Sequence, residues 1–136
     1  MIQQIEFTLP AFKRGCHIIT SHVTSQLPDL PESGLLQIFI KHTSAGLTLN
    51  ENADPSVLGD MDYILDKVVP ERDPGYAHTL EGDDDMPAHA KSSLVGASVM
   101  VPITNGRLNL GTWQGIYLCE FRNYAGPRKI VLTLMF

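Results

Sequence analysis

The stretch Leu35-Leu36-Gln37-Ile38-Phe39-Ile40-Lys41-His42 gives the strongest indication of the fold. Apolar residues occupy both alternating faces of this stretch, and a strand that is apolar on both faces is typical of a sheet interior. The next four residues, Thr43-Ser44-Ala45-Gly46, suit a tight loop into a further strand over 47–50. We therefore expect a central strand that ends at a polar loop.

Further strands are expected on both sides of this one. Residues 5–9 alternate apolar and polar side chains, which is typical of a half-buried strand, and Pro10 ends it. The segments 97–104 and 107–110 flank Asn105-Gly106, a residue pair that strongly indicates a β-hairpin. Strands are also expected over 16–19, 115–122 and 129–136.

Two main helices are expected between these groups of strands. Asp54-Pro55 combines an N-cap aspartate with a proline at the first helical position, and an apolar stripe continues as far as Pro70. After a polar loop, a second helix should begin near Pro87 and stop at Gly96, a typical C-cap residue. Two helices against about seven strands predict an α+β fold, and the length predicts one domain over 1–136.

The composition narrows the class of protein. A net charge of −5 disfavours a general binder of nucleic acid or anionic membranes, because such proteins present a basic face. No apolar run approaches the roughly 18 residues that span a membrane, and residues 1–6 do not resemble a signal peptide. Cys16 and Cys119 lie in apolar stretches without a CxxC motif, so we expect buried thiols and a cytoplasmic location.

Three histidines occupy positions that a plain core would not give them. His42 follows the central strand on the face of its buried residues, and His78 lies in the polar loop that carries an acidic run. His89 stands near the expected start of the second helix, where the helix dipole keeps the ring neutral. The backbone N–H groups at that helix start would also favour a phosphate.

The three histidines are a candidate metal site. Neutral imidazoles from three elements can form a three-histidine set that leaves one coordination position open, as in catalytic zinc sites. Each ring also has an ordinary alternative: a hydrogen-bonded structural residue for His42, solvated surface for His78 and an exposed helix start for His89. The run Asp83-Asp84-Asp85 is either a solvated lead-in to the helix or a magnesium site.

Two residues of the C-terminal third could line a pocket. Trp113 stands between glycines at 111 and 115, which suits a pocket wall, a core contact or a subunit contact. Glu120 falls on the inward face of its strand, where it could hold the second nitrogen of a histidine or act as a general base. The alternative for Glu120 is a salt bridge with a neighbouring arginine.

Three motifs of the chain, residues 42–52, 82–93 and 111–115, resemble the signatures of the YjbQ-like family, also called the secondary thiamine-phosphate synthase enzyme family. The resemblance covers nearly the whole chain. It implies an α+β fold with a strongly curved mixed or antiparallel sheet, a homotrimer, and a metal site of His42, His78 and His89. It also implies pocket-lining roles for Asn50, Glu51, Ser92, Trp113, Gln114 and Glu120. Some relatives have Glu-His-Arg where this chain has Glu120-Phe121-Arg122, so no histidine role carries over to that position.

The activity implied by the resemblance joins a hydroxymethylpyrimidine pyrophosphate to a thiazole phosphate and releases pyrophosphate. Displacing pyrophosphate requires cations for the leaving group and groups that orient the phosphate. Residues of the right type are Lys91, Arg107, Arg122, Ser92 and Ser93. Zinc or another transition metal is the expected cofactor, with magnesium as an alternative.

The sequence therefore predicts a metal-dependent transferase acting on a small phosphorylated molecule. The catalytic candidates are Glu51, Lys91, Ser92 and Glu120, and the substrate-binding candidates are Asn50, Ser93, Arg107, Trp113 and Gln114. Two alternatives remain: a non-catalytic trimer that binds a metal or ligand, and a metal-activated hydrolase.

Overall fold

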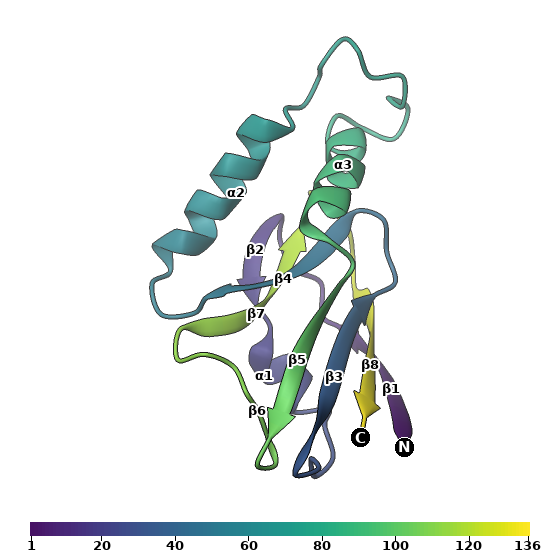
Figure 1. Ribbon diagram of the computed structural model, residues 1–136. Coiled ribbons are helices and arrows are strands. Elements are labelled where there is room, and N and C mark those ends of the chain that lie inside the picture. Colours follow the sequence, from purple (N-terminus) through teal and green to yellow (C-terminus); the bar gives the residue numbers. More distant parts are fainter.

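The chain folds into two antiparallel sheets and three helices, as described by a computed structural model of residues 1–136 (Figure 1). The strands are β1 (Ile2–Leu9), β2 (Gly15–Ile18), β3 (Ser33–Ile40), β4 (Ala45–Glu51), β5 (Ser98–Thr104), β6 (Arg107–Leu108), β7 (Gln114–Glu120) and β8 (Arg128–Met135). The helices are α1 (Thr20–Thr24), α2 (Ser56–Val68) and α3 (Asp85–Val95). Helices α2 and α3 lie at one end of the molecule, and both chain termini lie at the other (Figure 1).

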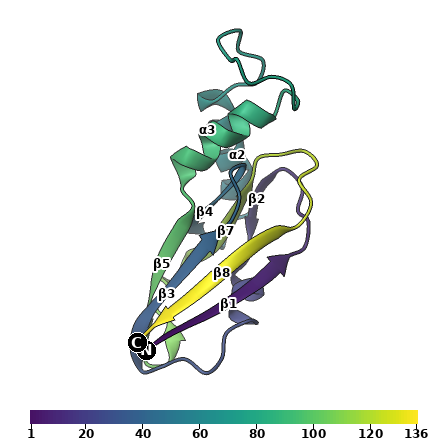
Figure 2. The ribbon, with the colours of Figure 1, turned by 90° about the vertical axis from the view of Figure 1, so that its right-hand side faces the viewer.

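The larger sheet has the strand order β1-β8-β3-β5-β6, and every pairing in it is antiparallel (Figure 2). The predicted central strand is confirmed, because β3 pairs with β8 on one side and β5 on the other. Only one face of β3 is buried, through Leu36, Ile38 and Ile40. On the other face, Leu35 and Phe39 remain 41% and 40% exposed, so this face of the sheet is uncovered.

The smaller sheet, in the order β2-β7-β4, lies between the larger sheet and helices α2 and α3, whereas α1 packs into the core between the sheets. Strand β7 shows this directly, because Ile116 and Leu118 join the core shared with the larger sheet. Tyr117 and Cys119 instead join a second core that includes Ala88 of α3. Since successive side chains of a strand point to opposite faces, β7 is buried on both. The order of layers is therefore sheet, sheet and helices.

The two main helices were predicted with different accuracy. Helix α2 begins at Ser56, one residue later than expected, and the Asp54 carboxylate accepts the Ser56 backbone N–H at 2.9 Å. Helix α3 ends at Gly96 as expected but begins at Asp85, two residues before Pro87. Proline is tolerated in the first turn of a helix, so the helix extends past it toward its N-terminus. His89 consequently lies a full turn inside α3, where the N-terminal dipole acts on it weakly.

The two cysteines are buried free thiols, as the sequence predicts. Cys16 of β2 lies directly opposite Cys119 of β7, and their sulfur atoms are 3.5 Å apart. None of the three helices combines the length and the apolar character needed to cross a membrane.

Candidate metal centre

Three potential ligands meet at the first turn of α3. The Nε2 atom of His78 lies 2.6 Å from Oδ2 of Asp85, and the Nε2 atom of His89 lies 3.1 Å from the same oxygen. The ligand atoms of all three side chains lie within 4.8 Å of one another. Two imidazole nitrogens and one carboxylate oxygen form a set that divalent transition metals bind with coordination positions left open.

Backbone geometry fixes the orientation of His89. Asp85 and His89 stand four residues apart on α3 and therefore share one helix face. The Nδ1 atom of His89 donates to the backbone carbonyl of Thr43 at 2.8 Å, so in the neutral ring the lone pair is on Nε2, facing Asp85. A metal-binding histidine typically has this arrangement, because the second-nitrogen contact sets both the tautomer and the ring orientation.

Arg122 holds the remaining oxygen of the Asp85 carboxylate. Its guanidinium donates to Oδ1 of Asp85, to Oδ2 of Asp84 at 2.9 Å and to the carbonyl of Glu81 at 3.0 Å. Burial alone raises the pKa of Asp85, but the His78 hydrogen bond and the interactions with His89 and Arg122 outweigh it, so the pKa lies below its ordinary value. Asp85 is therefore an ionised carboxylate at neutral pH, as a metal ligand must be.

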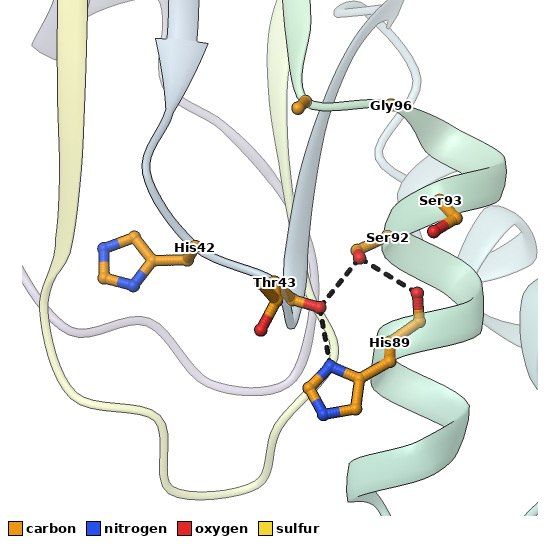
Figure 3. A pocket seen from close by; sticks show the side chains of 7 residues that line it. His42, Thr43, His89, Ser92, Ser93 and Gly96 are labelled. Carbon is orange, nitrogen blue, oxygen red and sulfur yellow. Dashed lines mark hydrogen bonds between the residues drawn. The ribbon is translucent and has the colours of Figure 1, made fainter.

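His42 does not belong to this ligand set, which corrects the three-histidine expectation. Its Nε2 atom accepts the backbone N–H of Lys129 at 2.8 Å. Its ring is directed away from His89, with Thr43 between the two histidines (Figure 3). Side-chain alternation placed His42 on the correct face, but it could not show that the edge of β8 occupies one ring nitrogen. Asp85 replaces His42 in the candidate set.

An open pocket of about 650 Å³ adjoins the cluster (Figure 3). It shares His89 with the cluster, and its lining residues are His42, Thr43, His89, Ser92, Ser93, Gly96 and Ala97. The Ser92 hydroxyl donates to the carbonyls of Thr43 and His89, at 2.8 and 3.0 Å. The structure therefore brings Ser92 and Ser93 to the same cavity as two of the predicted histidines.

The helix start itself is not a phosphate site, contrary to the expectation from the sequence. Asp84 and Asp85 occupy the N-terminus of α3, and Arg122, which pairs with both, offsets only one of their two negative charges. Ser92 and Ser93 lie in the last turns of the helix, where the dipole is unfavourable to anions.

Two expected catalytic residues are held in structural ion pairs. Lys91 is 1% exposed, pairs with Asp66 of α2 and lies 5.6 Å from the centre of the Phe121 ring. Glu120 is fully buried, and its Oε1 accepts the Arg128 Nε–H at 2.7 Å. The structure therefore shows the salt-bridge alternative for Glu120. Neither Lys91 nor Glu120 lines the pocket.

The remaining predicted residues lie away from the histidines. Glu51 pairs with Gln114 at one end of the β4–β7 ladder, whereas Ala45 pairs with Glu120 at the end near the pocket. The two ends are separated by six residues, about 20 Å at the usual rise of a strand. Trp113, next to Gln114, is 63% exposed. Of the five expected substrate-binding residues, only Ser93 lines the pocket. The other four, which do not line it, are Asn50, Arg107, Trp113 and Gln114.

Arg107 borders a different cavity. That cavity has a volume of about 450 Å³ and lies between α1, the segment 27–30 and the β5–β6 hairpin. Arg107 consequently cannot act on a ligand in the pocket beside His89 within one chain.

Asp85 and Arg122 were not predicted from the sequence as partners in the cluster. A signal for Asp85 was available, since an aspartate four residues before a histidine shares its helix face. Arg122 carried no such signal, because its contact with Asp85 joins residues 37 positions apart.

The fold and site together define an α+β protein of two stacked sheets, with a two-histidine, one-carboxylate cluster beside an open pocket. Residues 4–136 match the family described as UPF0047 protein YjbQ-like. The UPF0047 protein YjbQ of Salmonella typhimurium is 52% identical over 136 residues, which cover 98% of each chain. This chain belongs to the YjbQ-like family.

Solved structures agree with the fold. A YjbQ/UPF0047-family protein from Clostridium acetobutylicum superimposes with a TM-score of 0.82 at 39% identity, covering 96% of this chain and 99% of that one. A protein of unknown function from Sulfolobus solfataricus gives a TM-score of 0.84 at 21% identity, covering 99% and 97%. The α+β architecture expected from the sequence is confirmed.

Proposed function

We propose that the protein is a divalent-metal-dependent enzyme acting on a small phosphorylated substrate. The observation that carries this proposal is the convergence of His78, Asp85 and His89 beside an open pocket. Imidazole nitrogens favour zinc or another transition metal over magnesium, which prefers oxygen ligands. A metal held there would supply Lewis-acid chemistry and neutralise charge on a substrate oxygen.

Thiamine-phosphate synthesis is the named candidate for the reaction. The protein groups available in the pocket are neutral donors rather than ammonium or guanidinium groups. The cations expected from the sequence are placed elsewhere: Lys91 and Arg122 are in ion pairs, and Arg107 borders another cavity. In this proposal, the metal therefore neutralises most of the phosphate charge.

A metal-activated hydrolase is the second candidate, and the lack of a lysine or arginine in the pocket lining favours it. Releasing pyrophosphate places high negative charge on the leaving group, which protein cations normally stabilise. Hydrolysis of a monoester or lactone places less charge there and suits a metal with an open coordination position.

Turnover by the zinc-loaded protein tests both candidates. We expect product either from the pyrimidine pyrophosphate with the thiazole phosphate or from a panel of phosphate monoesters and lactones. In either case the rate should depend on zinc and fall to background in His89→Gln. His17→Gln, a histidine change outside the cluster, should keep the rate. Zinc binding without turnover on any of these compounds would instead establish the non-catalytic alternative.

We further propose a cytoplasmic homotrimer that uses the uncovered face of the larger sheet. Leu35, Phe39 and Met100 are between 40% and 45% exposed on that face, and the free thiols suit a reducing compartment. Sedimentation equilibrium should give a mass three times that of the chain, and Phe39→Glu should lower it, because a charge would enter an interface of about 800 Å² per partner. A single-chain mass at micromolar concentration would exclude the trimer.

A further inference from the structure

The hydrogen bond from Lys129 to His42 determines where the His42 ring carries its proton. The Nε2 atom accepts the Lys129 backbone N–H at 2.8 Å, so the lone pair of the neutral ring is on Nε2 and the proton is on Nδ1. Burial, followed by the positive charge of Arg128, lowers the pKa of His42 and keeps the ring neutral. His42 therefore presents a fixed N–H donor.

The pocket contains two further polar groups without protein partners. The hydroxyls of Thr43 and Ser93 make no hydrogen bond within the chain, and both residues line the pocket with His42. The Ser92 hydroxyl, in contrast, already donates to backbone carbonyls. The donors available to a ligand are thus one imidazole N–H and two hydroxyls.

The charges near His42 favour an anion on its side of the pocket. Arg128 is neutralised by Glu120, with which it pairs, so Lys129 and Lys41 supply the remaining positive charge that acts on His42. Lys129 has no ion-pair partner, whereas Lys41 pairs with Glu6. The opposite side of the pocket contains the C-terminal turns of α3, which disfavour anions.

We infer that His42 is not a metal ligand but the donor that binds a phosphate oxygen of the substrate, together with the hydroxyl of Thr43. This inference rests on the proposed function, because it assigns the phosphate of that substrate to one side of the pocket. The metal cluster lies on the other side, and His89 borders both. The two sites would hold the phosphate and the metal on either side of Thr43.

Binding of inorganic phosphate and zinc to two variants separates a donor from a ligand. In His42→Phe the ring has no donor, so we expect phosphate binding to weaken by roughly ten- to a hundredfold. His42→Gln, whose amide can still accept from Lys129 and donate to phosphate, should lose less and secures the test if His42→Phe folds poorly. Both variants should keep their zinc affinity. Any loss should be smaller than the roughly tenfold loss that follows when a residue contacting a metal ligand is removed.

The measurements are a phosphate titration with and without zinc, a zinc competition titration, and nitrogen NMR of the histidine rings. The NMR spectrum should show the proton of His42 on Nδ1, and its signals should shift on addition of phosphate. His17→Phe is the matched control, since His17 donates to the Lys13 carbonyl outside the pocket.

Several results would overturn the inference. These are loss of zinc from His42→Gln as large as from His89→Gln, unchanged phosphate affinity in His42→Phe, and no phosphate binding by the unmodified protein at millimolar concentration. A protein that binds phosphate through His42 but binds no zinc would instead contradict the proposed metal function and leave this assignment intact.

Discussion

Replacing Arg128 with methionine should lower the free energy of unfolding by about 3–5 kcal/mol. The change leaves the Glu120 carboxylate, which is 0% exposed, without the guanidinium that pairs with both of its oxygens. It also removes the donor to the Ser44 hydroxyl and carbonyl, which anchors the loop after β3 beside the pocket. Urea denaturation of the two proteins under identical conditions measures the loss.

Two further variants determine whether the buried charge is the cause. The double variant Glu120→Leu with Arg128→Met should recover most of the loss, because it leaves no uncompensated charge in the core. Lys41→Met breaks the Glu6–Lys41 pair, whose side chains are 48% and 44% exposed, and should cost less than about 1 kcal/mol. If Arg128→Met costs no more than Lys41→Met, Glu120 does not depend on Arg128 and our interpretation is wrong.

Replacing His89 with glutamine should weaken zinc binding by more than about a hundredfold, because losing an outer contact alone costs about ten- to a hundredfold. The variant removes one of two imidazole ligands and the contact to the Thr43 carbonyl that orients it. Asp85→Asn should have a similar effect, since it removes the only charged ligand of the cluster. Competition against a chromophoric chelator measures both affinities.

Arg122→Gln provides a graded comparison for the cluster. Arg122 contacts Asp85 but offers no ligand atom. Its loss should therefore weaken zinc binding by about ten- to a hundredfold, which is less than the loss expected for His89→Gln. His17→Gln should leave zinc affinity unchanged. Zinc affinity in His89→Gln within a few-fold of the unmodified protein would show that the metal, if bound, is held elsewhere.

Local patterns were sufficient to predict most elements of the fold. The apolar stretch 35–40, the Asn105-Gly106 pair and the Asp54-Pro55 helix start each predict structure through contacts within a few residues. The structure confirms all three. Two of the cluster residues, His78 and His89, were also identified, because polar residues at the edges of elements stand out from the apolar periodicity.

The amino-acid sequence by itself determined most of the strands and helices and two histidines, His42 and His89, that line one cavity. Only the tertiary structure decided which partners each side chain meets. The Lys129 N–H that occupies His42 is 87 residues away, and the Arg128 that neutralises Glu120 reaches it across a loop. Alternation and helical spacing specify the face on which a residue lies, but hydrogen bonds and ion pairs between distant segments depend on how the layers pack. For that reason Asp85 takes the ligand position that the sequence had suggested for His42, and Asn50 and Trp113 lie at the far end of β4 and β7.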